Sequence, residues 1–150
     1  SPARNKAEHQ NYVNYWRVKY DVETFRGFAL GIHKLSDLME KGSRYYDGIS
    51  YNSWEDYIRD GDGRRIGYGG CPLAMSVAGA MGCRANGNGL NYINEMLGYE
   101  PNKLYLRLPT HDRKKPSRAR TTLAQAVIGV TDKHRWPLTE TVSWLRMIGF

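Results

Sequence analysis

Apolar residues recur every three or four positions between Asp21 and Gly42, the clearest periodic stretch of the chain. They are Val22, Phe25, Ala29, Ile32, Leu35 and Met39. This spacing puts apolar side chains on one face of a helix. Asp21 is suited to cap its first turn and Gly42 to end it. The pattern predicts an amphipathic helix over residues 22–39.

Residues 67–83 form the longest stretch without a charge, and they contain both cysteines. Pro72 suits the first position of a helix, where its missing N–H costs nothing. The small residues Ala74, Ala78 and Gly79 would let a neighbouring helix approach closely. The stretch predicts a central buried helix that begins at Pro72.

Residues 12–20 fit two patterns. Trp16, Val18 and Tyr20 alternate as a strand would, whereas Tyr12, Trp16 and Tyr20 repeat every four residues as one helix face would. We favour the helix. Residues 1–10 are polar and form an N-terminal arm in this interpretation.

Further elements follow from local signals. Apolar spacing predicts a helix from Leu90 to Leu97 that ends at Gly98, and alternating leucines predict a short extended piece over 104–108. Two more helices follow, one capped by Thr121 or Thr122 and one opened by Pro137 or Thr139.

Residues 42–70 are expected to be mostly irregular, with one helical turn within 53–58. A hairpin near 57–68 is favoured over a calcium loop beginning at Asp60, because Cys71 stands where the loop's bidentate glutamate would be. The predicted fold class is mainly α: one helical domain over 1–150, with five or six helices and this short hairpin.

Length and composition agree with a single domain. The chain has 150 residues and no apolar run near the roughly 20 residues that span a bilayer. The first six residues lack the apolar core of a signal peptide, so we expect a cytoplasmic protein. A helix from Pro72 would separate Cys71 and Cys83 by about 18 Å, too far for a disulfide.

The net charge of +7 is concentrated in the last third of the chain. Residues 106–150 hold nine basic and three acidic residues, whereas residues 1–60 hold nine of each. Two prolines prevent a continuous helix over 107–120, so we expect a loop that presents positive charge. Such a field favours nucleic acid, or a nucleic-acid-containing assembly, as the partner. The candidate binding residues are Arg107, Arg113, Lys114, Lys115, Arg118, Arg120, Lys133 and Arg135.

Exposed tyrosines would be able to stack on bases of a single strand, and Tyr45, Tyr46 and Tyr51 are the candidates. Two alternatives stay open. One is a phage-type protein-binding factor that acts on a host machine or a virion component, or that binds an acidic protein surface through its tyrosines and tryptophans.

The second alternative is a cysteine hydrolase. The nucleophile would be Cys71, with His111 or His134 as base and Asp112 or Asp132 to orient it. We expect no cofactor, and the scattered histidines give no indication of a metal site.

The sequence also resembles an uncharacterised family of small helical proteins from bacteria and their phages. The matching segments lie between residues 29 and 148: Leu38–Glu40, Asp60–Gly70, Cys71–Ala74 with Ala78 and Gly79, Gly129–Asp132 and Thr141–Leu145. The resemblance implies a compact helical fold and a bacterial or phage origin, with the host cytoplasm as compartment in the latter case. It implies no catalytic residue.

Overall fold

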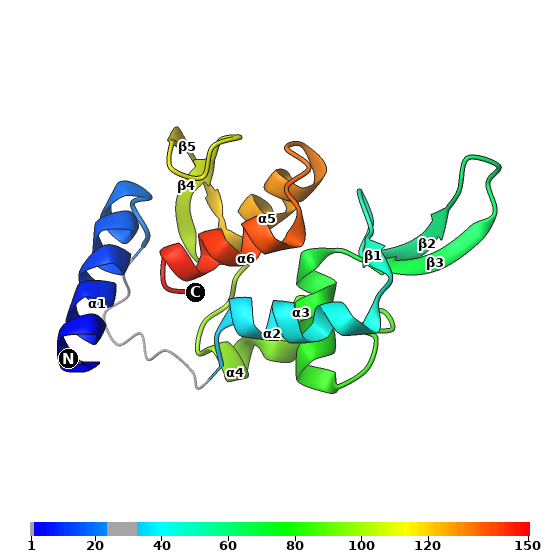
Figure 1. Cartoon of the computed structure of the whole chain (residues 1–150), viewed down its shortest axis with the longest axis horizontal. Coiled ribbons are helices and arrows are strands. Elements are labelled where there is room, and N and C mark those ends of the chain that lie inside the picture. The colour runs from blue at the N-terminus through cyan, green and yellow to red at the C-terminus, as the bar shows by residue number, and fades with distance from the viewer. Residues whose placement is uncertain (1, 24–32) are drawn as a thin grey trace.

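A computed structural model of the chain describes residues 2–23 and 33–150, with side chains from residue 5 onward (Figure 1). Its helices are α1 (Pro2–Lys19), α2 (Leu35–Gly42), α3 (Pro72–Met81), α4 (Asn94–Leu97), α5 (Leu123–Asp132) and α6 (Leu138–Met147), with 3₁₀ turns η1 (Ser43–Tyr45) and η2 (Leu90–Ile93). Its strands are β1 (Gly48–Ile49), β2 (Glu55–Arg59), β3 (Arg65–Gly70), β4 (Tyr105–Pro109) and β5 (Pro116–Thr122).

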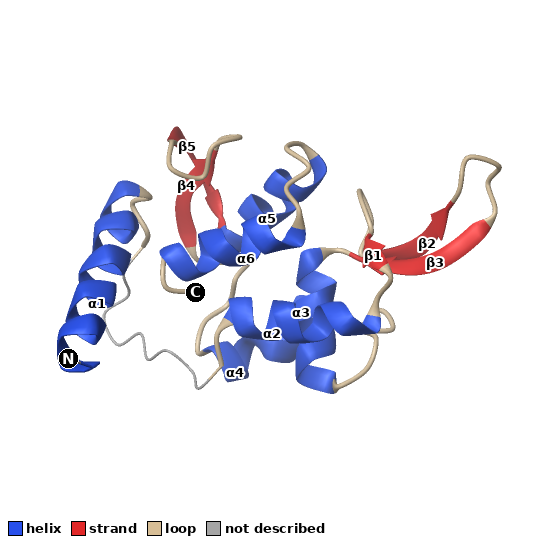
Figure 2. Ribbon diagram, in the orientation of Figure 1, coloured by secondary structure: helices blue, strands red, loops and turns tan. Residues whose placement is uncertain are grey.

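The fold class is mixed, so the predicted mainly α domain is wrong. In the described residues, six helices accompany two small sheets (Figure 2). The sequence indicated the β2–β3 hairpin and β4, but it did not indicate β1 or β5, because much of their surface faces water. Such strands lack the clean apolar alternation that a half-buried strand shows.

The first sheet has the strand order β1-β3-β2, with β1 parallel and β2 antiparallel to β3. Tyr57 pairs with Tyr68 and Ile58 with Gly67, which confirms the hairpin expected near 57–68. The helical turn expected within 53–58 is wrong, because residues 53–54 form a bend and β2 begins at Glu55. Figure 2 shows this hairpin projecting from the helical body.

The second sheet pairs β4 with β5 in an antiparallel hairpin. Arg107 lies opposite Arg120 and Pro109 opposite Pro116, with an irregularity between the two pairs. The extended piece expected over 104–108 is confirmed. The loop expected over 107–120 is correct only for the turn at residues 110–115, because the flanking residues belong to β4 and β5. Prolines at the ends of these paired segments are compatible with a two-stranded ribbon, whose outer edges need no partner.

Helix α3 is the central buried helix, as predicted. Pro72 occupies its first turn, residues 72–79 are buried, and Gly82 ends it in the left-handed conformation (φ 77°). Helix α2 packs directly against it. A Cβ atom on Gly42 would overlap the Met75 carbonyl, and one on Gly79 would overlap the Leu38 carbonyl.

The predicted helix over 22–39 is only partly present. Its C-terminal part is α2, which starts at Leu35 and ends with Gly42. Asp21 caps no helix: it is exposed in a turn at a positive φ of 46°. Phe25, Ala29 and Ile32 lie outside the described residues.

The other helix predictions are confirmed. Residues 12–19 are helical, within α1, which also includes residues 2–10. The segment 90–97 forms η2 and α4 and ends at Gly98 (φ 81°). The Thr122 hydroxyl caps α5 by accepting the Gln125 amide, and Pro137 precedes α6. In the described ranges, no helix combines the length and apolar character needed to cross a membrane.

Candidate nucleic-acid interface

The turn of the β4–β5 hairpin is held by its own hydrogen bonds. The Thr110 hydroxyl donates to the Lys115 carbonyl (2.6 Å), and the Asp112 carboxylate accepts the Lys114 amide (2.9 Å). The side chains of Lys114, Lys115 and Arg118 are left exposed. To the extent that the chain is described, none of these three side chains has a hydrogen bond or ion pair.

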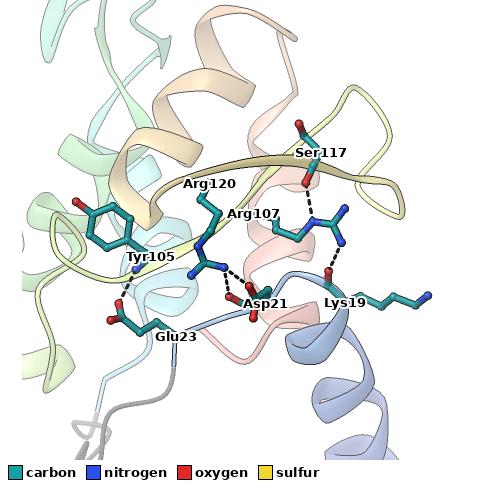
Figure 3. A network of polar contacts seen from close by, with 7 residues as sticks. All are labelled: Lys19, Asp21, Glu23, Tyr105, Arg107, Ser117 and Arg120. Carbon is teal, nitrogen blue, oxygen red and sulfur yellow. Dashed lines mark hydrogen bonds and ion pairs between the residues drawn. The ribbon is translucent and has the colours of Figure 1, made fainter.

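Arg107, the first of the predicted binding residues, instead fastens the hairpin to α1 (Figure 3). Its guanidinium is half-buried and donates to the carbonyls of Ser117 (2.6 Å), Pro116 (3.3 Å) and Lys19 (3.1 Å). A planar guanidinium carries five N–H donors in fixed directions, so it can bind several carbonyl oxygens around it at once. With its donors used internally, Arg107 is a structural residue.

Arg120 has a comparable role on the opposite strand. It forms an ion pair with the Asp21 carboxylate and also donates to the Asp21 carbonyl (2.9 Å). Nearby, the Tyr105 amide donates to the Glu23 carboxylate (3.1 Å; Figure 3). These contacts hold the chain that leaves α1 against the hairpin.

Arg113 is also occupied. It forms an ion pair with Glu140 of α6 (3.1 Å), and its carbonyl accepts the hydroxyl of the buried Tyr20. Burial raises the pKa of that hydroxyl far above its ordinary value. These two contacts hold the turn of the β4–β5 hairpin between the end of α1 and the start of α6.

The connection between α5 and α6 packs on the same turn. The Trp136 indole N–H donates to the His111 carbonyl (3.0 Å), and the rings of His111 and His134 lie 5.8 Å apart. Desolvation, the positive charge of Lys133 and the proximity of His111 lower the pKa of His134. These contacts place the exposed Lys133 and Arg135 beside the hairpin turn.

Arg135 also lies over an aromatic ring. Its guanidinium carbon is 4.0 Å from the centre of the Tyr51 ring, and Arg135 has a positive φ of 53°. Tyr51 is 40% exposed, so the pair is a surface feature. We define the basic cluster as the exposed cations that the structure brings around the hairpin turn: Lys114, Lys115, Arg118, Lys133 and Arg135.

The three tyrosines predicted to be exposed for base stacking differ in their burial. Tyr46 is buried, where its hydroxyl donates to Glu55 (2.7 Å) and accepts the Ala85 amide (2.8 Å). Tyr45 is half-buried against the core. Only Tyr51, of these three, is exposed beside the basic cluster.

Cys71 does not have the surroundings of a nucleophile. Its sulfur accepts the Ala74 amide at the start of α3 (3.4 Å), yet burial raises the pKa of the thiol to about 11. The carboxylate of Asp132, which lines the same pocket, is a smaller contributor to this rise in pKa. His111, the expected base, lines a different pocket together with His134. The structure therefore provides no support for a Cys71–His111 pair.

Cys71 and Cys83 are both free thiols, as their predicted separation requires. Among the described residues, no group of three or more His, Cys, Asp or Glu side chains is placed to hold a metal ion. Comparisons with known protein families, with curated proteins and with solved structures find no match.

The sequence did not indicate the residues that accept hydrogen bonds from Arg107 and Arg120 and so hold the β4–β5 hairpin against the end of α1. Lys19, Asp21 and Ser117 contribute through backbone carbonyls or a turn carboxylate. A carbonyl is common to every residue and so leaves no sequence signal. The arginines themselves were visible, but their division into structural and free cations depends on tertiary contacts.

Proposed function

We propose that the protein binds nucleic acid, alone or within an assembly, by contacting phosphates with the basic cluster. The observation that carries the proposal is that Lys114, Lys115 and Arg118 are exposed and unpaired in the described chain, while packing brings Lys133 and Arg135 beside them. Phosphate binding needs several cations on one surface, and cations already in ion pairs contribute less. Backbone contact, rather than base reading, is the main source of affinity in this proposal.

The hairpin changes the expected binding surface in two ways. The hairpin fixes the direction of the cations more firmly than a loop would, which lowers the entropy lost on binding. Three of the eight predicted arginines and lysines are committed to the fold, so the expected footprint is smaller than the sequence indicated.

Fluorescence anisotropy with labelled single-stranded and duplex oligonucleotides tests the proposal at two or more salt concentrations. We expect the wild-type affinity to fall steeply with salt. The Lys114→Ala/Lys115→Ala variant should weaken binding to every sequence and reduce the slope of log K against log salt by roughly 2.

The matched control is Lys41→Ala/Arg44→Ala, which removes the same charge from exposed positions of α2 and η1. It should bind nearly as well as the wild type. Equal affinities of the two double variants, or binding that salt leaves unchanged, would contradict the proposal.

The projecting β2–β3 hairpin favours a protein-binding factor as the second candidate. Ile66 is 64% exposed and Tyr57 45% exposed on this hairpin, and apolar side chains on a projecting element suit a protein contact. A pull-down that compares wild type with Ile66→Ser tests it. A partner retained only by the wild-type protein supports this function, and identical retained sets count against it.

A further inference from the structure

A pocket of about 370 Å³ opens beside the basic cluster, between α5, the start of α3 and the segment before β2. Its walls are mainly apolar: Pro72 and Leu73 come from α3, Val127 and Ile128 from α5, and Trp54 from the segment before β2. Small-molecule sites have volumes of roughly 300–1,000 Å³. This pocket is near the lower limit, so it suits one heteroaromatic ring system rather than a long ligand.

Asp132 is the charged residue of this pocket, whose lining also includes the polar residues Asn52, Ser53 and Thr131. One carboxylate oxygen accepts the Asn52 amide (3.0 Å), which fixes the side chain across the segment before β2. The other oxygen has no hydrogen bond or ion pair to any described residue. A fixed carboxylate at the edge of an apolar pocket is an acceptor for a ligand with N–H donors.

The rim of the pocket is continuous in sequence with the basic cluster. Lys133 follows Asp132, and Tyr51, which precedes Asn52, lies under Arg135. A strand whose phosphates contact Lys133 and Arg135 therefore runs past the mouth of the pocket. A base turned out of that strand would enter between Trp54 and the α5 wall.

From this geometry we infer that the pocket receives one extruded guanine base of a single-stranded nucleic acid and that Asp132 recognises it. The inference rests on the proposed function, which supplies the strand. Guanine presents two adjacent N–H donors, at N1 and N2. The unbonded oxygen of Asp132 can accept one of them, and the oxygen that holds the Asn52 backbone amide has a second lone pair for the other. Pockets for extruded bases combine apolar or aromatic walls with hydrogen bonds to the base-pairing edge. In a duplex that edge is base-paired and is freed only at the cost of unpairing, so a single strand is the favoured ligand of the pocket.

The test uses labelled 12-residue oligothymidylates in which one central base is thymine, guanine or hypoxanthine. Hypoxanthine differs from guanine only by lacking the 2-amino group. We expect guanine to raise the affinity of the wild-type protein roughly tenfold over thymine, and hypoxanthine to lose most of that gain. Pairing the guanine oligonucleotide with its complement should abolish the gain.

The informative variant is Asp132→Asn. Asparagine keeps an oxygen acceptor for the Asn52 amide, so the fold should be retained, which thermal unfolding checks. The variant should bind the thymine oligonucleotide as the wild type does, or slightly better, and lose the guanine preference. Asp62→Asn, at an exposed position of the β2–β3 turn, makes the same charge change and should keep the preference.

The outcomes separate the two proposals. Salt-sensitive binding without a base preference, or a preference that survives Asp132→Asn, overturns the guanine pocket and leaves the proposed function intact. If no oligonucleotide binds, the proposed function fails. A guanosine titration followed by NMR then tests separately whether the pocket binds guanine. Shifts at Trp54 and Ile128 would support the pocket, and their absence would overturn it.

Discussion

Cys71 illustrates how a single side chain can have the position of a reactive group and lack its electrostatics. It is the N-cap residue of α3, where the helix dipole favours a thiolate. Burial works in the other direction and is the larger effect, so the pKa of the thiol rises to about 11. Pro72, next in the chain, has no amide N–H to add to the site. At the residue scale, Cys71 is a cap that closes the start of the central helix.

The two cysteines should therefore differ sharply in alkylation. At pH 8, only on the order of one Cys71 thiol in a thousand is ionised when its pKa is about 11, whereas an ordinary thiol is about one quarter ionised. Mass spectrometry after iodoacetamide treatment should find Cys83, which is exposed, modified far faster than Cys71. Modification of Cys71 should accelerate above pH 10 or on unfolding.

The Cys71→Ser and Cys83→Ser variants assign each alkylation rate to one thiol. Fast modification of Cys71 at pH 7 in the folded protein would contradict the raised pKa and restore the hydrolase hypothesis. The raised pKa of Cys71 also makes the stability of the protein depend on pH. Because the folded state holds the thiol proton more tightly, the contribution of Cys71 is present below about pH 8.5 and lost as the pH rises toward 11.

Helices α2 and α3 pack with their backbones in close contact, and two glycines make this contact possible. At Gly42 and at Gly79, the position that a Cβ atom would occupy is filled by backbone atoms of the other helix. Backbone cannot move aside as a flexible side chain can, so the helix axes would have to separate. That separation would also loosen the buried side chains of α3.

Gly42→Ala should lower the free energy of unfolding by about 3 kcal/mol or more, at the upper end of overpacking effects. Gly61→Ala is the matched control, because a Cβ at Gly61 meets nothing within 4 Å and its φ is not in the left-handed region. It should leave stability within about 0.5 kcal/mol of the wild type. Urea unfolding measures both, and equal stabilities would contradict the close contact.

At the scale of the whole molecule, the β4–β5 hairpin holds the C-terminal end of α1, which also packs on Phe150 through Arg17 (Figure 1). Arg107 and Arg120 hold the end of α1, while Tyr20 contacts both the turn at Arg113 and the core tryptophan Trp144, with ring centres 5.6 Å apart. The same hairpin carries the free cations. Folding and the proposed binding thus depend on different residues of one element.

Arg107→Lys should separate these two roles. Lysine keeps the charge but cannot supply the three fanned donors, so we expect a loss of about 1–3 kcal/mol in stability and faster hydrogen exchange over residues 5–20. Arg118→Lys, on the same hairpin, should change neither, because Arg118 has no partner in the described chain. Hydrogen-exchange mass spectrometry compares them, and unchanged exchange in Arg107→Lys would contradict the anchoring role.

The helices that the sequence predicted well are those whose signals are local. Pro72 at the start of α3, Thr122 before α5 and Gly98 after α4 act through their own backbone conformation or their own hydrogen bond, so neighbouring residues suffice to identify them. The β2–β3 hairpin was found for the same reason. The helix expected over 22–39 started wrongly because its apolar spacing continues through Val22, although Asp21 forms a turn.

The sequence by itself determined the charge distribution, the central helix and the absence of a Cys71–Cys83 disulfide, since each depends on composition or on residues near one another. The tertiary structure alone decided which cations are free. Arg107, Arg113 and Arg120 find carbonyls and carboxylates far away in the chain, whereas Lys114, Lys115 and Arg118 find none among the described residues. The physical reason is that a hydrogen bond depends on distance in space, and the spacing of residues along a chain does not specify that distance.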